Sequence, residues 1–75
     1  MIYLTRQDAT QNINRFYSMH LQPDLFGPVC VAKEWGRLGA AGTVRQEVYS
    51  DEHAARAAMT ERMKRKAKRG YRAAS

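Results

Sequence analysis

Residues 33–42 read Lys33-Glu34-Trp35-Gly36-Arg37-Leu38-Gly39-Ala40-Ala41-Gly42, and they hold the chain's only tryptophan and three of its five glycines. An apolar run at residues 29–32 precedes this stretch, and an alternating run at residues 43–49 follows it. The pattern predicts a strand, a glycine-rich turn and a second strand. Because the turn is short, we expect an antiparallel hairpin. Glycines this dense suit a backbone with positive φ, or one that another backbone, such as a sugar-phosphate, approaches closely.

The N-terminal part of the chain predicts two further strands. Residues 1–8 are rich in β-formers and are expected to be an edge strand. In residues 15–21, alternation puts Tyr17 and Met19 on one face, which is the predicted core face. Phe16 falls on the opposite face, which indicates that the second side of the sheet is not fully bare. Two prolines and a glycine then mark a connection before the central hairpin.

The first strand of the hairpin is predicted to be central. Both of its faces begin apolar in residues 29–32, so we expect it to be covered on both sides at its start. Toward the turn it becomes polar, and Lys33 and Trp35 share a face on the period of two. These two side chains are therefore expected to emerge from the sheet together. On the partner strand, Arg45 is expected on the same side.

A helix is predicted after the last strand. Ser50 is a good N-cap, and the acidic pair Asp51 and Glu52 suits the positive end of the helix dipole. Gly70 is expected to end the helix, Tyr71 to dock back on the body, and the residues beyond it to fray. A narrow apolar stripe for packing on the sheet is formed by Ala55, Ala58, Met59 and Met63.

These elements predict an α+β fold, in which an antiparallel sheet of about four strands carries one C-terminal helix packed on a face. With 75 residues, the chain is expected to form a single domain, residues 1–75. At this size the core is small and a roomy catalytic cleft is not expected. The sequence has no signal peptide and no apolar stretch of membrane length, so we expect a cytoplasmic protein that does not bind membranes.

Positive charge is concentrated at the C-terminal end. The formal net charge is +6, yet residues 1–55 hold five Lys or Arg against six Asp or Glu, whereas residues 56–75 hold eight against one. The basic helix contributes Arg62, Lys64, Arg65, Lys66, Lys68 and Arg69. Such a basic end predicts a polyanionic partner, with nucleic acid first. A solvated helix face that only aids solubility is the alternative interpretation.

The sequence offers little material for catalysis or metal binding. His20 and His53 are the only histidines, Cys30 is the only cysteine, and neither a nucleophile–base set nor metal-ligand spacing is present. The three glycines of residues 33–42 lack the Lys-Ser/Thr of a phosphate-binding loop. We therefore expect no enzyme activity, no cofactor and no metal, and we interpret Cys30 as a small buried hydrophobe.

A binding site is predicted around the tryptophan. An indole at a polar strand end can stack on a base, and Arg37 can hold a phosphate through two hydrogen bonds, although a core tryptophan and a surface ion pair are the alternatives. Lys33 is a point-charge phosphate contact, and Arg45 and Arg15 are weaker candidates. The residues assigned to a nucleic-acid contact are Trp35, Gly36, Arg37, Lys33, Gly39, Gly42, Arg45 and Arg15.

At these residues the chain resembles the WGR domain family, named for a Trp-Gly-Arg motif that is Trp35-Gly36-Arg37 here. Residues 14–21 resemble the family's opening Asn-x-[FY]-Tyr strand, and residues 35–42 its Trp-Gly-Arg-[VI]-Gly-x-x-Gly core. Residues 54–63 fall at its Ala-rich helix, and residues 66–71 resemble its Lys-x-x-x-Gly-[YW] ending. The resemblance covers about residues 12–72. It implies an antiparallel sheet with one helix packed on it.

The resemblance also implies a function. In eukaryotic poly(ADP-ribose) polymerases the domain binds DNA breaks, where the motif Trp packs on the terminal nucleotide near the 5′ end and the motif Arg makes polar contacts or relays a signal. By analogy, Trp35 is the stacking residue and Arg37 the polar contact. Bacterial relatives also occur as small stand-alone proteins. This chain has no catalytic domain of a polymerase, so ADP-ribosylation is not implied for it, and a relay role for Arg37 is in doubt.

Two hypotheses from different classes follow. The first is a stand-alone nucleic-acid-binding module that prefers DNA ends or nicks, with DNA favoured over RNA only through the resemblance. The second is a protein-interaction adaptor that docks a polypeptide through its Trp-Gly-Arg edge.

Overall fold

The computed structural model describes residues 1–23 and 27–73. Residues 24–26 of the predicted connection and residues 74–75 of the predicted tail lie outside the described residues. In chain order, the elements are β1 (Ile2–Asp8), a short 3-10 helix (Ala9–Gln11), β2 (Ile13–Pro23), β3 (Val29–Arg37), β4 (Thr43–Tyr49), α1 (Glu52–Lys68) and β5 (Arg72–Ala73).

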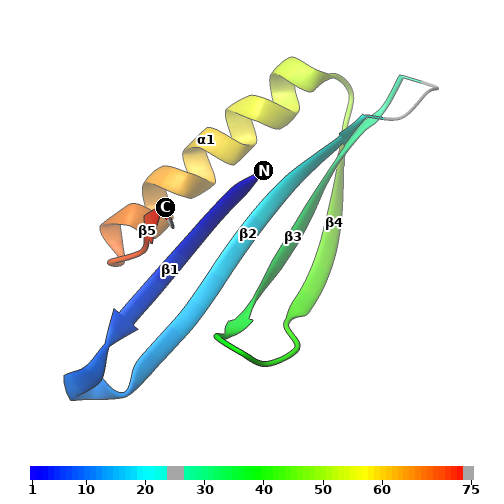
Figure 1. Cartoon of the computed structure of the whole chain (residues 1–75). Helices are drawn as coiled ribbons and strands as arrows, with labels where there is room; N and C mark the ends of the chain where they lie inside the picture. The colour runs from blue at the N-terminus through cyan, green and yellow to red at the C-terminus, as the bar shows by residue number, and fades with distance from the viewer. Residues whose placement is uncertain (24–26, 74–75) are drawn as a thin grey trace.

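The strands form one antiparallel sheet in the order β4-β3-β2-β1-β5, and α1 lies along one face of it (Figure 1). The predicted α+β class, the antiparallel hairpin and the helix on a sheet face are confirmed. The fifth strand is a correction, because the sequence predicted about four strands and a fraying end. Tyr71 is buried and its N–H donates to the Lys66 carbonyl at 3.1 Å, which brings Arg72 and Ala73 alongside β1. As a result, β1 is not the outermost strand, although only its residues Leu4 and Thr5 pair with β5.

The core lies between α1 and the sheet. Its largest fully buried side chain is Met19, and Ala55 and Met59 of α1 pack in the same cluster. The cluster of buried residues consists of Leu4, Tyr17, Met19, Val29, Val31, Ala55, Met59 and Tyr71. The opposite side of β3 carries no helix, and Cys30 there is only half-buried, so the expected cover on both sides of this strand is absent among the described residues.

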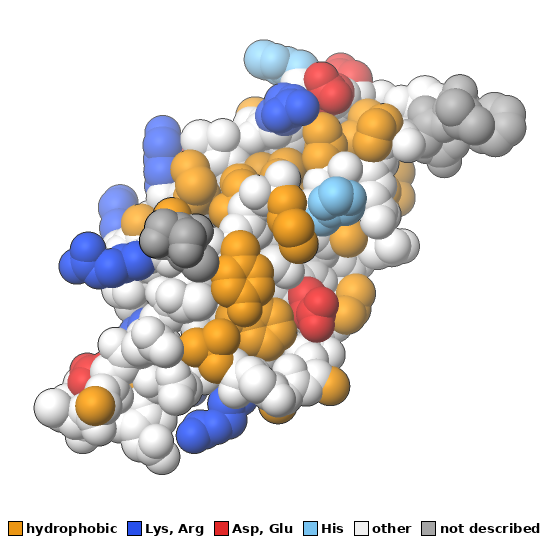
Figure 2. Space-filling model, viewed as in Figure 1, with side chains coloured by type: hydrophobic (Ala, Val, Ile, Leu, Met, Phe, Trp, Pro, Cys, Tyr) orange, Lys and Arg blue, Asp and Glu red, His pale blue; other side chains and the backbone are white. Residues whose placement is uncertain are grey.

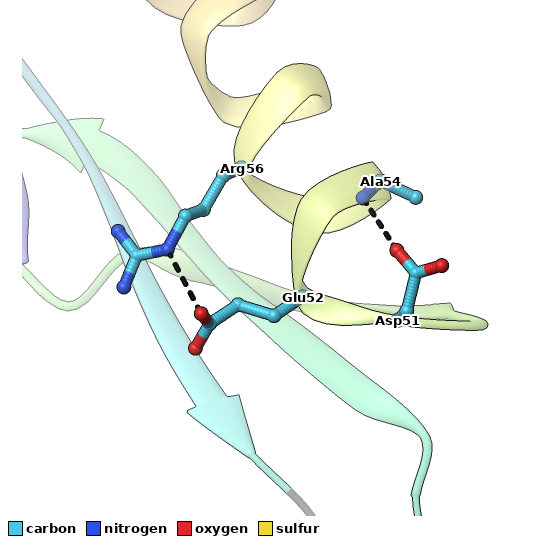
Figure 3. A network of polar contacts seen from close by, with 4 residues as sticks. All are labelled: Asp51, Glu52, Ala54 and Arg56. Atoms are coloured by element: carbon cyan, nitrogen blue, oxygen red, sulfur yellow. Dashed lines mark hydrogen bonds and ion pairs between the residues drawn. The ribbon is translucent and has the colours of Figure 1, made fainter.

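The helix begins one residue later than predicted. Asp51, not Ser50, is the N-cap, and its side chain accepts a hydrogen bond from the Ala54 N–H at 2.8 Å (Figure 3). A carboxylate makes a stronger, charge-assisted bond to this end of a helix than a hydroxyl does. Glu52 also forms an exposed ion pair with Arg56 at 3.5 Å (Figure 3). At the other end Gly70 has φ +96° and stops the helix as expected.

The sheet-facing stripe of α1 differs from the predicted one. Ala55 and Met59 are buried, but Met63 is 36% exposed. One turn further on, the half-buried positions are Arg62 and Lys66, which continue the stripe at spacings of three and four residues. The helix therefore meets the sheet with apolar side chains at its N-terminal half and with cations at its C-terminal half.

The glycines of the β3–β4 turn serve the fold itself. Gly39 has φ +83° in a turn closed by the Ala40 N–H donating to the Arg37 carbonyl at 3.1 Å. A Cβ built on Gly42 would lie 2.8 Å from both the Phe16 ring and the Trp35 carbonyl oxygen. The close backbone approach inferred from the sequence is therefore an approach of this chain to its own strand β3.

This contact leads to a test. Replacing Gly42 with Ala forces its new methyl group into backbone, so we expect a loss of up to about 3 kcal/mol of unfolding free energy. Gly39→Ala is the control, because a Cβ there meets open space and the loss is limited to the positive φ, about 1 kcal/mol. Urea unfolding measures both. A Gly42 variant no less stable than the Gly39 variant would contradict the packing described.

Candidate nucleic-acid interface

The register of strands β1 to β4 puts their positive charges on one face. Strands β1 to β4 contain five Lys or Arg residues. Arg6 pairs with Arg15, Arg15 pairs with Arg37, and Lys33 pairs with Arg45. Cross-strand partners point to the same side of a sheet, and side chains two positions apart on one strand share a face. The five cations share their face with the buried core residues, so all five lie on the side that carries α1.

Three of these cations form a continuous row across the sheet. Arg6, Arg15 and Arg37 are direct neighbours on β1, β2 and β3, and we call them the arginine row. Arg15 and Arg37 are exposed, and neither takes part in any ion pair between the described residues. Arg6 runs past the end of α1, where a Cβ on Gly70 would lie 3.4 Å from its Nε. Like charges directly opposite one another destabilise a sheet, so this row favours an anionic partner.

Trp35 lies in the next row, opposite Tyr17. The two rings stack with centroids 6.1 Å apart and an interplanar angle of 21°. Trp35 packs against the edge of the core but is only half-buried. The ring is therefore held in place by the fold and retains solvent-accessible surface, which is intermediate between the projecting indole and the core tryptophan considered from the sequence.

Lys66 reaches from α1 toward these rings. Its Nζ lies 4.6 Å from the Tyr17 ring centroid and 5.2 Å from that of Tyr71. Burial lowers the pKa of Lys66, and the neighbouring charges of Arg69, Arg62, Arg15 and Lys33 lower it further. The ammonium is therefore crowded by like charge in the absence of an anion. A bound polyanion would reverse this effect and stabilise the charged form.

Two neighbouring hollows open on this face. The larger, of about 520 Å³, is lined by residues 11–14 and by Arg15, Trp35, Gly36, Arg37, Lys66 and Tyr71. The smaller, of about 110 Å³, is lined by Tyr17, Lys33, Trp35, Arg62 and Lys66. The two hollows meet at Trp35 and Lys66, which line both. We call the larger one the Trp35 hollow. Its described lining brings two aromatic rings together with three cations and no carboxylate.

Lys33 does not emerge as predicted. It is 8% exposed and forms an ion pair with Glu47 of β4. The hydrogen bond from Lys33 holds the pKa of Glu47 below its ordinary value, and the charges of Lys33, Arg62 and Arg45 lower it further. Alternation correctly placed Lys33 on the Trp35 face, but it could not show that Glu47 would lie on the neighbouring strand to neutralise it. Lys33 is therefore a structural cation at the floor of the smaller hollow.

The remaining predicted residues are spread more widely. Arg45 is exposed on the expected face, and the helix cations Lys64, Arg65, Lys68 and Arg69 are exposed around α1. Arg65 pairs with Glu61 at 3.8 Å. Of the three predicted turn glycines, Gly36 alone lines the Trp35 hollow.

Sequence reasoning missed several members of the site. Arg6 was not assigned to it, although counting the register of β1 against β2 would have paired it with Arg15. Tyr71 was expected to dock on the body, but its place beside Lys66 in the Trp35 hollow was not foreseen. Residues 11–13 were not assigned to the site, because their role comes only from their position at the start of β2.

Among the described residues, no group of three or more His, Cys, Asp or Glu side chains is arranged to hold a metal ion. No helix within that part of the chain has the length and apolar character needed to cross a membrane.

The Lys33–Glu47 pair leads to a second test. Glu47→Gln leaves a buried ammonium without its counter-charge, and we expect a loss of about 1–2 kcal/mol of unfolding free energy, discounted because Glu47 is 43% exposed. Adding Lys33→Met should restore most of it. Since the folded pKa of Glu47 is lowered, its contribution is complete at neutral pH and is lost as pH falls through that lowered pKa, below 4.5. Urea unfolding against pH measures this; a Gln variant as stable as the parent at pH 7 would contradict it.

Comparisons with known proteins agree with the fold and the motif. The family model described as the WGR domain matches residues 1–75. An uncharacterized protein, y4dW of Sinorhizobium fredii (strain NBRC 101917 / NGR234), is 35% identical over 71 residues, which is 95% of this chain and 35% of that protein. The chain thus spans about a third of the length of this relative. No solved structure matches significantly. Because the family model matches the whole of residues 1–75, the chain belongs to the WGR domain family, a family of nucleic-acid-binding modules.

Proposed function

We propose that this chain binds nucleic acid through the Trp35 hollow and prefers DNA ends, nicks or other exposed termini. The observation that carries the proposal is the juxtaposition of a half-buried indole with the unpaired Arg15 and Arg37 and with Lys66. The membership of the WGR family supports the nucleic-acid part of the proposal. The preference for termini is argued from the chemistry of the hollow.

Stacking on Trp35 favours a terminus. Inside a duplex both faces of each base are covered by neighbouring bases, and exposing one costs a few kcal/mol. At an end or a nick one face of the terminal nucleotide can be reached without that cost. A stacked base contributes about 1–3 kcal/mol, so the gain at a terminus is not offset as it is in the duplex interior.

The cations beside the ring favour a terminal phosphate. A phosphomonoester carries a charge of about −1.5 to −2 at pH 7, whereas each internal phosphodiester carries one negative charge. Arg15 and Arg37 project from directly paired positions, so their guanidinium groups can converge on one phosphate. Lys66 adds a third positive charge from α1. A doubly charged terminal phosphate is therefore attracted to these three cations more strongly than an internal phosphodiester is.

The exposed cations of α1 have a different role in the proposal. Lys64, Lys68 and Arg69 are exposed beyond the hollow and make no ion pair among the described residues. They attract a polyanion from a distance and contribute affinity without selecting a terminus. We propose binding without catalysis, and DNA in preference to RNA. The adaptor hypothesis is less well supported, because the docking edge it requires is the most crowded positive region of the sheet.

The first test of the proposed function concerns Trp35. Trp35→Ala is expected to weaken binding to a nicked, 5′-phosphorylated duplex about tenfold or more, since a stacked base contributes about 1–3 kcal/mol. Binding to a closed circular duplex should change little. Trp35→Phe is the control, because it keeps a packed aromatic ring and should retain most of the preference. Fluorescence anisotropy of labelled nucleic acid measures this, with single strands and RNA as further arms.

An unchanged ratio of nicked to closed-duplex affinity in the folded Trp35→Ala variant would remove the end-specific proposal. Equal binding of the parent protein to DNA and heparin at all salt concentrations would do the same.

Another test of the proposed function distinguishes the contribution of Arg37 to binding from that of the helix cations. Arg37→Gln should reduce the preference for a 5′-phosphate over a 5′-hydroxyl end by about tenfold, as expected for the loss of a charge-assisted contact of about 1–3 kcal/mol. Arg69→Gln removes the same charge from the exposed helix, and should weaken binding to both ends equally while lowering the salt slope by about one. If the two variants behave alike, Arg37 acts only as part of the diffuse positive charge.

A further inference from the structure

The face of the sheet away from α1 has a distinct composition. We call it the open face; strands β1 to β4 contribute to it Tyr3, Thr5, Gln7, Asn14, Phe16, Ser18, His20, Gln22, Cys30, Ala32, Glu34, Gly36, Val44, Gln46 and Val48. These residues include no Lys and no Arg, although the chain has 13. At its two sides, Tyr3 is 40%, Val44 60% and Val48 72% exposed. The space-filling view shows hydrophobic side chains gathered along the strands, with Lys and Arg at the margins (Figure 2).

A stacked aromatic pair on β1 and β2 forms part of the open face. Tyr3 stacks on Phe16 with ring planes 7° apart and centroids 6.0 Å apart. Phe16 is 7% exposed and rests against the glycines Gly36 and Gly42. Small or polar side chains surround this pair. A surface of this kind can meet another sheet closely with little rearrangement.

We propose that the open face is a self-association surface, on which two copies of this chain pack face to face about a twofold axis. Charge determines the occupant. A polyanion meets Glu34 there and, among the described strands, one cation, Arg72 of β5, which pairs with Thr5 at the margin of the face. A second copy, with a net charge of +6, is repelled most strongly by the face that carries α1 and the five cations of β1 to β4.

Face-to-face packing separates the positive charges of the two copies. Stacked sheets lie about 10 Å apart, and the five sheet cations project from the far side of each sheet. They are therefore separated by more than the screening length of about 8 Å at physiological ionic strength. The hydrophobic contact of Tyr3, Phe16, Val44 and Val48 is then opposed by little electrostatic repulsion.

The area of the face is close to the lower limit for a specific interface. Four strands at about 4.8 Å spacing and about 29 Å in length present about 550 Å², or about 1,100 Å² for two copies. Specific interfaces begin near this area. We therefore expect a dimer that dissociates in the micromolar range.

Such a dimer would be bivalent. The Trp35 hollow lies on the opposite side of the sheet from the open face, so two hollows would point away from each other and could each hold one terminus. This consequence rests on the proposed function, whereas the dimer itself does not.

The experiment is sedimentation equilibrium of the full chain from about 1 to 500 µM, without nucleic acid, where mass action makes a weak dimer visible. The parent chain is expected to dimerise, and Val44→Lys with Val48→Lys to weaken the dimer at least tenfold. The matched control adds the same charge on the exposed side of α1, through Ala57→Lys with Thr60→Lys, and should lower the affinity less than threefold. Far-UV circular dichroism checks that each variant is folded.

A second variant separates the open face from the sheet edge. Val44 and Val48 lie on the edge strand β4, which also offers an edge for strand-to-strand pairing of two copies. Tyr3→Lys lies at the other side of the open face and should also weaken a face-to-face dimer at least tenfold. The proposal is overturned if the parent chain is monomeric throughout, if the control weakens the dimer equally, or if folded Tyr3→Lys leaves it intact.

Bridging is measured separately, by capture of one labelled duplex through a second, immobilised duplex. If the dimer forms and bridging fails, the dimer proposal stands and the placement of the nucleic-acid site is wrong.

Discussion

The pairing of β2 with β3 is the constraint on which the rest of the molecule depends. It sets Tyr17 opposite Trp35 and Arg15 opposite Arg37, so the core, the aromatic ring and the guanidinium groups all follow from one register. A shift of one residue would turn every side chain of β3 to the other face. Phe16 against the two glycines helps to prevent such a shift, because a Cβ at either glycine would crowd its neighbours.

The same register concentrates charge in a way that does not favour the isolated fold. Three arginines in direct cross-strand contact and a lysine crowded by other cations both oppose folding of a small domain. The chain compensates in part, through Glu47 beside Lys33. It provides no such carboxylate for Arg15 or Arg37 among the described residues. The fold is therefore less stable than it could be at Arg15 and Arg37, where a polyanion is proposed to bind. At the buried Lys33, Glu47 neutralises the charge and the fold is stabilised.

More of the fold than of the candidate site could be predicted from the sequence. Alternation and turn chemistry placed Tyr17 and Met19 in the core, Trp35 beside a cationic face, and Gly70 at the end of α1. These features depend on neighbours in the sequence. The fifth strand and the burial of Lys33 depend on contacts across the sheet, which local patterns do not contain. The sheet-facing position of Lys66 was not predicted, because Met63 also has the spacing of the buried helix stripe, and an apolar residue is the stronger sequence signal for burial.

The division of charge between the two faces explains why one thin sheet can have two roles. A layer with cations on both sides would attract polyanions to both and would repel its own copies in every orientation. Here α1 and all five cations of β1 to β4 lie on one side, and the other carries Tyr3, Val44 and Val48 in exposed positions. Because successive side chains of a strand point to opposite faces, this separation requires each Lys or Arg of β1 to β4 to fall on the correct parity. The same parity that builds the proposed nucleic-acid site therefore leaves the open face with little like-charge repulsion, since its one cation among the described strands is Arg72 of the marginal strand β5.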